Sequence, residues 1–298
     1  MSSIKSPERI IPTEEKNVTE KRTLYLVGTP IGNLSDISER ALKVLSEVDF
    51  IAAEDTRSSG KLLAYYGIKK PLISYFEHNK RERGEVIVSR IIETGEACAL
   101  ITDAGMPAIS DPGEDIVRLC AERGVRVSVV PGPCAAVSAL AMSGLFTGKF
   151  VFEGFLPTGK GERREALDAL KDEKRTVIFY EAPHKLRRTL DDLFAAFGDR
   201  KISLCRELTK INEEVIRTTI AEAVSYYAER EPRGEYALIM EGASKEELLS
   251  RAFWADMSIE EHVEHYAAEG MSKNDAIKAT ARDRGVAKSE IYNAVMIK

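Results

Sequence analysis

From Thr23 onward, short apolar runs rich in β-branched residues alternate with stretches of helical period, and this alternation admits few folds. A strand, an amphipathic helix and a second strand in succession are typical of a βαβ unit. In the first half, apolar residues recur at helical spacing between expected strands at residues 24–28, 50–53, 72–75, 97–102 and 125–130. We therefore expect a parallel sheet with helices on both faces.

The alternation begins again after residue 149, with expected strands at 150–155, 177–180, 202–206, 215–219 and 236–240. The last two of these strands are joined by the short amphipathic stretch 221–228, which is too short for a long crossover, so we expect some antiparallel pairing. The helix between the second and third strands has one apolar stripe, made of Leu186, Leu190, Leu193, Phe194 and Phe197. The second half is therefore expected to be an α/β domain with a mixed sheet.

Beyond Gly242 the strand signal stops and the chain has only helical patterns. The end of the chain predicts a helix, a turn centred on Gly285 and a second helix, with core positions at Ala276, Ile277, Thr280, Val286, Ile291 and Val295. We expect a flexible tail over residues 1–22, an α/β domain over 23–144, a second α/β domain over 145–243, and a helical, helix-turn-helix-like module over 245–298.

The charge of the chain limits its partners. With 43 basic and 48 acidic residues the net charge is −5, so the whole molecule lacks the positive field of a nucleic-acid coat protein. Residues 271–298, however, contain six basic and three acidic groups. This local excess favours contact with a polyanion, although a solvated helix face explains it almost as well.

Targeting and redox signals both favour the cytoplasm. No apolar run approaches the roughly 18–20 residues that span a bilayer. The first 22 residues have five basic and four acidic side chains and no apolar core, so we expect neither a secretory signal nor a transit peptide. The four cysteines form no C-x-x-C pair, which argues against a zinc site and a disulfide framework.

Three turns rich in glycine and proline follow strands of the first sheet, at residues 28–33 (GTPIGN), 103–113 (DAGMPAISDPG) and 131–135 (PGPCA). Open α/β sheets bind ligands at the carboxyl ends of their strands. No G-x-G-x-x-G motif follows the first strand, which argues against a dinucleotide. The low charge of the three turns favours a pocket for a zwitterionic ligand rather than a polyphosphate.

A further glycine motif, residues 154–160, has the spacing of a phosphate-binding P-loop. Gly161 stands where a P-loop requires Ser or Thr, and Pro157 lacks a backbone N–H. We therefore do not expect nucleotide hydrolysis. The basic side chains beside these glycines are more typical of a mobile loop that contacts a phosphate backbone: Lys160, Arg163 and Arg164.

The succession T-P-I-G-N, A-E-D-T-R, D-A-G-x-P, S-D-P-G, P-G-P-C, E-G-F, F-Y-E and E-L-T-K resembles the tetrapyrrole (corrin/porphyrin) methylase superfamily. Within it, the chain is most similar to the bacterial small-subunit ribosomal RNA cytidine 2′-O-methyltransferases. The resemblance runs from Thr23 to about Gly242, and the terminal helices resemble the small C-terminal domain of that subgroup. It implies two α/β domains, S-adenosylmethionine in the cleft between them, a homodimer, and 16S rRNA of the 30S subunit as substrate.

Carried over by motif, the resemblance also implies the cofactor contacts. They are Pro30, Ile31, Asp103, Gly105, Met106, Ile109, Cys134, Ala135, Tyr180, Leu208 and Tyr236. Met106 departs from the pattern, because the rRNA subgroup commonly has a small hydroxyl residue there. The resemblance leaves two other functions open: methylation of a tetrapyrrole, and RNA binding without catalysis.

Methyl transfer to a ribose hydroxyl needs an aligned acceptor and a group that removes its proton, but no metal. Asp55, His78 and Lys210 are the candidate catalytic residues. Asp55 or Thr56 can instead cap the following helix, His78 can be an ordinary surface histidine, and Lys210 can be a base or a phosphate contact. The candidate substrate contacts are Glu54, Arg57, Asn79, Lys160, Arg163, Arg164 and Glu207.

Overall fold

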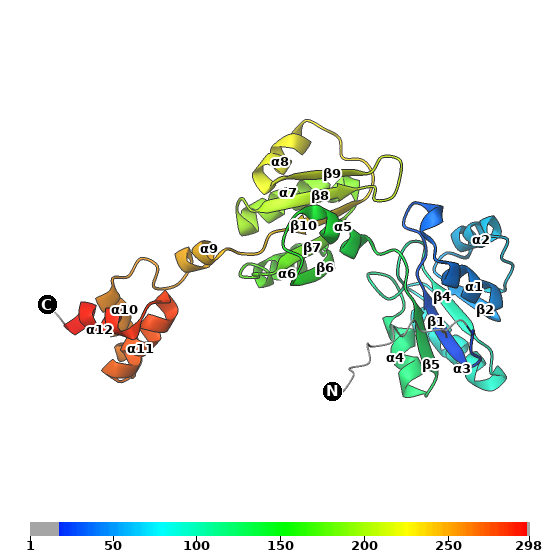
Figure 1. The fold of residues 1–298 in the computed structure, drawn as a ribbon, viewed down its shortest axis with the longest axis horizontal. Helices are drawn as coiled ribbons and strands as arrows, with labels where there is room; N and C mark the ends of the chain where they lie inside the picture. Colours follow the sequence, from blue (N-terminus) through cyan, green and yellow to red (C-terminus); the bar gives the residue numbers. More distant parts are fainter. Residues whose placement is uncertain (1–17, 297–298) are drawn as a thin grey trace, which may run out of the picture.

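The structure is a computed structural model that describes residues 18–296. Two α/β domains and a group of terminal helices lie in a row (Figure 1). Of the expected flexible tail, residues 1–17 lie outside the described part, and residues 19–22 lie against the first domain. The Lys21 ammonium donates to both carboxylate oxygens of Asp49 at 2.6 and 2.8 Å, and the Arg22 N–H donates to the Gly95 carbonyl. The first domain therefore includes residues before Thr23.

The first domain is a five-stranded parallel sheet in the order β3-β2-β4-β1-β5. Its strands are β1 (Thr23–Val27), β2 (Phe50–Ala53), β3 (Leu72–Ser74), β4 (Cys98–Ile101) and β5 (Arg126–Val130). Its helices are α1 (Glu39–Glu47), α2 (Thr56–Tyr65), α3 (Lys80–Thr94) and α4 (Glu114–Glu122), with a 3₁₀ turn, Leu34–Asp36. Buried residues of α1 and α2 pack on one face and those of α3 and α4 on the other, so the prediction of a sheet covered on both faces is confirmed.

Helix α5 (Ala135–Ser143) follows β5 but packs on the second sheet. Its buried residues Ala136, Ala139 and Leu140 form one cluster with Ile178 and Ile239. The expected boundary at residue 144 is therefore wrong by one helix, because the small side chains of α5 fit the second sheet closely.

The second sheet has the order β6-β7-β10-β8-β9, in which β6 and β7 are parallel and every other pair is antiparallel. Its strands are β6 (Phe150–Phe155), β7 (Thr176–Glu181), β8 (Lys201–Arg206), β9 (Glu214–Thr219) and β10 (Tyr236–Met240). The expected antiparallel pairing is present, but β9 and β10, which the short helix joins, lie on either side of β8 and do not pair with each other. Strand β6 has an irregularity between Phe152 and Gly154, so the P-loop-like glycine belongs to a strand.

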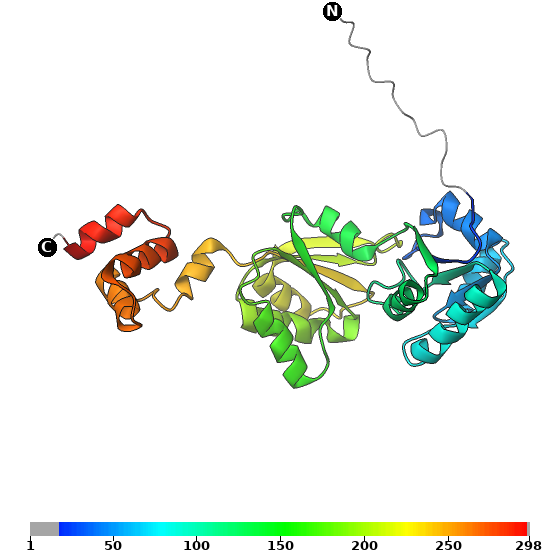
Figure 2. The same cartoon turned by 90° about the horizontal axis from the view of Figure 1, so that it is seen from below.

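Helices α6 (Lys160–Ala169), α7 (Pro183–Phe197) and α8 (Ile220–Ala228) cover one face of this sheet, and α5 covers the other (Figure 2). The apolar stripe of α7 is buried as expected, with the exception of Phe194, which is 45% exposed. The predicted apolar stripe of α7 therefore includes one residue, Phe194, that does not belong to the buried core.

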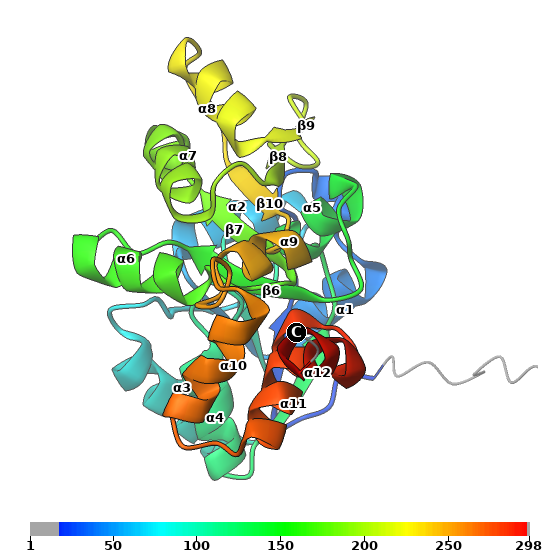
Figure 3. The same ribbon diagram turned by 90° about the vertical axis from the view of Figure 1, so that its left-hand side faces the viewer.

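The terminal helices are α9 (Lys245–Ser250), α10 (Ile259–Ala268), α11 (Lys273–Arg284) and α12 (Lys288–Met296). The last three helices lie against one another (Figure 3). They form their own apolar cluster, which includes Val263, Ala276, Ile277 and Ile291. Gly285 ends α11 in the left-handed conformation, so the predicted turn is confirmed. Val286 is exposed rather than buried, because it directly follows that turn.

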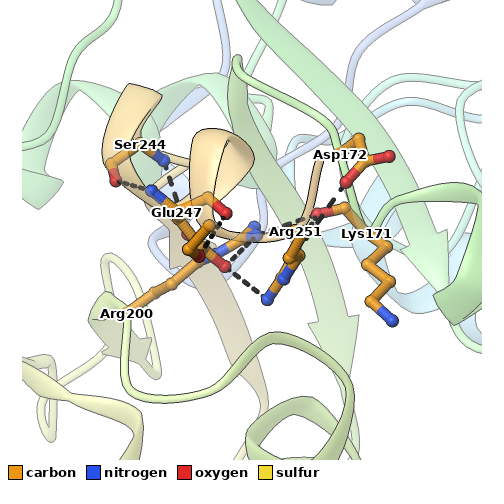
Figure 4. A network of polar contacts seen from close by, with 7 residues as sticks. Lys171, Asp172, Arg200, Ser244, Glu247 and Arg251 are labelled. Carbon is orange, nitrogen blue, oxygen red and sulfur yellow. Dashed lines mark hydrogen bonds and ion pairs between the residues drawn. The ribbon is translucent and has the colours of Figure 1, made fainter. Parts of the chain in front are cut away.

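Helix α9 is attached to the second domain by a polar network, which Figure 4 shows. Ser244 and Glu247 form a capping box at the start of the helix. The Glu247 carboxylate also accepts from the guanidinium of Arg200, whose side chain is 4% exposed, at 2.8 Å, and from Arg251 at 2.6 Å. Both arginines donate to the Lys171 carbonyl, at 2.9 and 3.2 Å. We refer to Arg200, Glu247, Arg251 and Lys171 as the α9 network.

Within residues 18–296, no helix is long and apolar enough to cross a bilayer.

Candidate active site

A cavity of about 250 Å³ lies between the two α/β domains, at the carboxyl ends of β1, β4 and β5. This is the edge at which the three glycine- and proline-rich turns were expected to meet. Its walls combine apolar side chains with a few polar groups. The lining residues are Ile31, Ala104, Gly105, Met106, Ile109, Ser110, Asp111, Cys134, Ala135, Phe155, Tyr180, Glu181, Ala182, Cys205, Glu207, Leu208, Lys210, Glu235, Tyr236 and Ala237.

The three turns of the first domain hold one another by close backbone contacts. Thr29 and Gly105 exchange two backbone hydrogen bonds, at 2.9 and 3.1 Å. A Cβ atom on Gly28 would lie 2.7 Å from the Gly132 Cα and 2.7 Å from the Met106 sulfur. Glycine at position 28 therefore makes room for both the third turn and the Met106 side chain.

The second turn, residues 103–113, has an unusual backbone. Ala108 and Ser110 have φ values of 67° and 63°, a left-handed conformation that costs roughly 1–3 kcal/mol for a residue with a side chain. Gly105 has φ 86°, and a Cβ there would lie 3.3 Å from the Ile31 Cγ2. These conformations turn the segment so that Ile109 and Asp111 line the cavity.

Tyr180 forms the second-domain wall. Its hydroxyl oxygen accepts from the Ala136 N–H at 2.8 Å, which ties β7 to the first turn of α5. Phe152 and Phe155 pack edge-on against its ring, at centroid distances of 5.0 and 5.6 Å. Burial raises the pKa of Tyr180 to about 12, so the hydroxyl keeps its proton and can donate it to a ligand.

The E-L-T-K segment closes the same wall with a strained turn in which Glu207 and Thr209 have positive φ. The Lys210 ammonium lies 2.9 Å from a carboxylate oxygen of Glu207 and 2.9 Å from one of Glu235. Burial favours the neutral amine, but these hydrogen bonds outweigh it and raise the pKa of Lys210. Lys210 is therefore a cation held by two carboxylates, and its interpretation as a base of lowered pKa is wrong.

The first turn also touches the E-L-T-K segment directly. The Asn33 N–H donates to the Thr209 hydroxyl oxygen at 3.0 Å. A Cβ on Gly32 would lie 2.5 Å from the Lys210 Cγ, 2.7 Å from the Thr209 hydroxyl oxygen and 3.0 Å from the Leu208 carbonyl oxygen. The two domains therefore approach closely on this side of the cavity, where only glycine fits.

Three carboxyl groups lie near one another on the first-domain side. Burial, together with the charge of Asp103, raises the pKa of Glu54, and burial, together with the charge of Asp55, raises the pKa of Asp103. For Asp111, burial and the charges of Glu54 and Asp103 raise the pKa to about 7. Of these three, only Asp111 lines the cavity.

Most residues expected to contact the cofactor line this cavity, although their role stays a prediction. They are Ile31, Gly105, Met106, Ile109, Cys134, Ala135, Tyr180, Leu208 and Tyr236. Pro30 and Asp103 do not line it. Asp103 lies instead beside Glu54, where β2 and β4 end.

Of the residues expected on the acceptor side, Glu207 and Lys210 line the cavity and Asp55 does not. Asp55 caps α2, with its carboxylate accepting from the Arg57 N–H at 2.8 Å and pairing with the Arg57 guanidinium at 3.1 Å. Those contacts lower the pKa of Asp55, which makes it a poor base. The Arg57 side chain is 88% exposed, and its guanidinium is paired with Asp55.

His78 and Asn79 lie in the turn after β3 and do not line the cavity. His78 is exposed and packs edge-on against Phe76. The Asn79 side chain accepts from the Phe76 N–H and donates to the Ser74 carbonyl, so it stabilises the turn itself. The structure therefore favours the surface interpretation of His78.

Lys160, Arg163 and Arg164 belong to helix α6, so the expectation of a mobile loop is wrong. The Arg163 side chain is buried, because its guanidinium donates to Asp192 at 2.6 Å, to Thr189 at 2.8 Å and to the Pro157 carbonyl. Lys160 and Arg164 stay exposed, beside Arg188, over a shallow hollow between α6 and α7. Arg163 thus stabilises the fold and cannot reach a phosphate.

Sequence reasoning missed several lining residues, including Phe155, Cys205, Glu235 and Asp111. Asp111 stands in the S-D-P-G motif that supported the resemblance, but the motif alone did not single out its carboxyl group. Glu235 and Glu207 are 28 residues apart in sequence, with β9 and α8 between them, and the pairing of β10 with β8 brings the two together.

Comparison with known proteins finds relatives that are similar in sequence and a solved structure that is similar in fold. It is 50% identical to the ribosomal RNA small subunit methyltransferase I of Halalkalibacterium halodurans, over 92% of this chain and 94% of that protein. The protein of the same name from Thermotoga maritima is 48% identical, over 74% of this chain and 98% of that protein. A uroporphyrin-III-C-methyltransferase from Thermus thermophilus shares the fold, with a TM-score of 0.53, 20% identity and coverage of 77% of this chain and 97% of that one.

The sequence pattern of the tetrapyrrole (corrin/porphyrin) methylases matches residues 23–224, which span the first sheet, most of the cavity lining and most of the second sheet. That match, the 50% identical relative and the shared fold agree with one another. This chain therefore belongs to the tetrapyrrole (corrin/porphyrin) methylase family.

Proposed function

We propose that this protein transfers the methyl group of S-adenosylmethionine to the ribose 2′-oxygen of a cytidine in 16S rRNA, on the 30S subunit in the cytoplasm. The observation that carries the proposal is the cavity between the two α/β domains, in a chain whose 50% identical relative is named a small-subunit rRNA methyltransferase. The resemblance of the motifs to the 2′-O-methyltransferase subgroup supplies the acceptor atom.

The residues of the cavity suit S-adenosylmethionine, which is a zwitterion with an additional sulfonium charge. Ile31, Met106 and Leu208 provide apolar walls for a nucleoside. The Tyr180 hydroxyl can donate to an acceptor group, and the carboxylate of Glu207 favours a positively charged ligand. When bound, the sulfonium makes its methyl carbon open to displacement.

The acceptor side of the cleft fits RNA. Arg57 is exposed at the start of α2, where its guanidinium pairs with Asp55, the residue that follows Glu54. A guanidinium in this position can bind the phosphate beside the target ribose. The exposed cations Lys273, Lys278, Arg282 and Lys288 of the terminal helices supply further phosphate contacts.

We also propose that the protein acts as a homodimer. Strands β5 and β6 are the outer strands of their sheets. Large apolar side chains on and near them are exposed, namely Val129, Val137, Phe146 and Phe150. A second copy would cover such a surface. Sedimentation equilibrium at micromolar concentration should give twice the mass of the chain, and a monomer would contradict the dimer.

The function is tested by transfer of a labelled methyl group from S-adenosylmethionine to 30S subunits, to free 16S rRNA and to uroporphyrinogen. We expect label in 30S subunits, located on a cytidine ribose by nuclease digestion and mass spectrometry. Label in the tetrapyrrole would establish a small-molecule methyltransferase. Binding of 30S subunits with no transfer to any acceptor would establish a non-catalytic RNA-binding protein.

A further inference from the structure

The ionisable side chains around the cavity differ in whether they already have a partner. Glu207 accepts from the Lys210 ammonium and from the Glu235 N–H, and these contacts lower its pKa. Glu181 accepts from the Ala182 N–H and the Thr189 hydroxyl group, and Glu235 pairs with Lys210. Each of these carboxylates therefore already has a hydrogen-bond or ion-pair partner within the protein.

Asp111 is different. Among the residues that the structure describes, no lysine, arginine or histidine forms an ion pair with its carboxyl group. The charged groups that face it are the carboxyl groups of Glu54, which follows β2, and Asp103, which follows β4. Across the cavity, the charge of Asp111 contributes to the raised pKa of Tyr180. The Thr102 hydroxyl lowers its pKa, but by less than burial and the neighbouring carboxyls raise it. Its surroundings therefore make Asp111 a better proton acceptor than the other cavity carboxylates.

The position of Asp111 also suits the acceptor. It lies on the same cavity wall as Gly105, Met106 and Ile109, but at the end of the turn that adjoins Glu54 and Asp103. The left-handed residues Ala108 and Ser110 hold the loop in this form, and Ser110 meets the second domain, where a Cβ on Gly154 would lie 3.2 Å from its hydroxyl oxygen. Strained backbone of this kind is typical of segments that place functional groups.

We propose that Asp111 is the general base that removes the proton from the acceptor hydroxyl group. This inference rests on the proposed function. One Asp111 carboxylate oxygen takes the 2′-hydroxyl proton, and the oxygen lone pair forms the new O–C bond to the methyl carbon. The C–S bond breaks and its electron pair stays on sulfur, which leaves neutral S-adenosylhomocysteine. The Asp111 carboxylic acid then returns its proton to water.

The test compares Asp111→Asn with the wild-type protein in single-turnover methyl transfer to 30S subunits between pH 5.5 and 9. Asp191→Asn is the matched control, because Asp191 is an exposed aspartate on α7 outside the cavity. We expect the wild-type rate to rise tenfold per pH unit and to level off near pH 7, where the pKa of Asp111 lies. The methyl-transfer rate of Asp111→Asn should be at least 100-fold lower than that of the wild-type protein at pH 8, and its pH profile should have no bend near pH 7.

Two measurements separate a base from a structural residue. Calorimetry should give Asp111→Asn and the wild-type protein the same affinity for S-adenosylmethionine within threefold. In wild-type protein labelled with ¹³C-aspartate, one carboxyl signal should titrate near pH 7 and should be missing from Asp111→Asn. The wild-type titration does not depend on the folding of the variant, because the absence of any aspartate signal that titrates above pH 6 would by itself contradict the proposal.

Three outcomes would overturn the proposal: Asp111→Asn within threefold of the wild-type rate, an unchanged bend in its pH profile, or no carboxyl signal that titrates above pH 6. None of them affects the proposed function, which fails only if the wild-type protein transfers no methyl group to 30S subunits.

Discussion

The chain has two junctions between its folded parts, and they are built in opposite ways. Between the α/β domains, the backbone of Gly32 packs directly against the E-L-T-K segment, where a Cβ would lie 2.5 Å from the Lys210 Cγ and 3.0 Å from the Leu208 carbonyl oxygen. The second domain contacts the terminal helices through a polar network centred on Glu247, a residue of the six-residue helix α9. The first junction encloses the cavity, whereas the second attaches the short helix α9 through side-chain hydrogen bonds and ion pairs.

This difference predicts what each junction is for. Close packing of backbone tolerates little change, so the cleft fixes the geometry of the groups around the cavity. An ion-pair network attaches the terminal helices at one place and leaves their own core separate. The Thermotoga relative is covered over 98% of its length by 74% of this chain, so a quarter of this chain has no counterpart in it. We therefore expect the cleft to determine catalysis and the terminal helices to adjust substrate binding.

The largest effect is expected from Gly105→Val. A branched side chain at this position would lie against Ile31 and fill the cavity, so the affinity for S-adenosylmethionine should fall on the order of 100-fold, about 2.7 kcal/mol. Gly67→Val is the matched control, because Gly67 also has a positive φ, 72°, but nothing lies within 4 Å of its Cβ position. Calorimetry checks the affinity, and thermal melting checks that both variants lose similar stability from backbone strain. Equal affinities in the two variants would place the cofactor elsewhere.

A smaller effect is expected from two truncations that differ by the α9 network. Removal of residues 252–298 keeps Glu247, whereas removal of residues 245–298 leaves the buried Arg200 guanidinium without its carboxylate. The longer deletion should therefore be less stable by about 2 kcal/mol, since breaking a buried ion pair strands a charge. Both truncated proteins should bind S-adenosylmethionine as the full chain does, and both should lose affinity for 30S subunits.

Urea denaturation measures the stabilities, and the salt dependence of 30S binding should become flatter in both truncated proteins as phosphate contacts disappear. Arg200→Leu in the longer deletion is the control, because it removes the stranded charge and should restore part of the stability. Two truncated proteins of equal stability would show that the α9 network does not support the second domain. Unchanged 30S binding would reject the RNA role of the terminal helices.

The contrast between the junctions also explains which features of the fold can be predicted from the sequence. Strand order along the chain follows from local patterns, and all ten expected strands are present within about two residues of their expected ends. Local patterns do not say which sheet a helix packs on, so they place α5 in the first domain, whereas it packs on the second sheet. The motifs located most of the cavity because they lie in turns at strand ends.

The charges of the site were harder to predict, because a charge depends on its partners. Arg163 and Lys210 stand in sequence among residues that suggest phosphate contacts or catalysis. Only the fold shows that α7 supplies Asp192 to Arg163, and that β10 brings Glu235 to Lys210. Asp111 is the reverse case, a carboxyl group that the fold leaves without a cation.

The smallest effect concerns the terminal helices alone and follows from His262. Its side chain is fully buried between the rings of Trp254 and Tyr266, and its Nδ1 accepts from the Arg284 guanidinium at 3.2 Å. Burial first, and then the charge of Arg284, lower the pKa of His262, so the folded ring stays neutral at a pH where an unfolded histidine, of pKa about 6.5, binds a proton.

Because the unfolded chain binds the extra proton, the terminal helices should lose stability as the pH falls below about 6.5. The loss at pH 5.5 should be on the order of 1 kcal/mol or less. Trp254 is the single tryptophan of the chain and stacks on His262, so its fluorescence reports these helices within the full-length protein. In urea, the midpoint of the fluorescence change should be lower at pH 5.5 than at pH 7.5. His262→Gln should abolish that difference, whereas His265→Gln, at a more exposed position, should keep it. A difference that survives in His262→Gln would mean that other groups, and not this buried ring, make the terminal helices sensitive to acid.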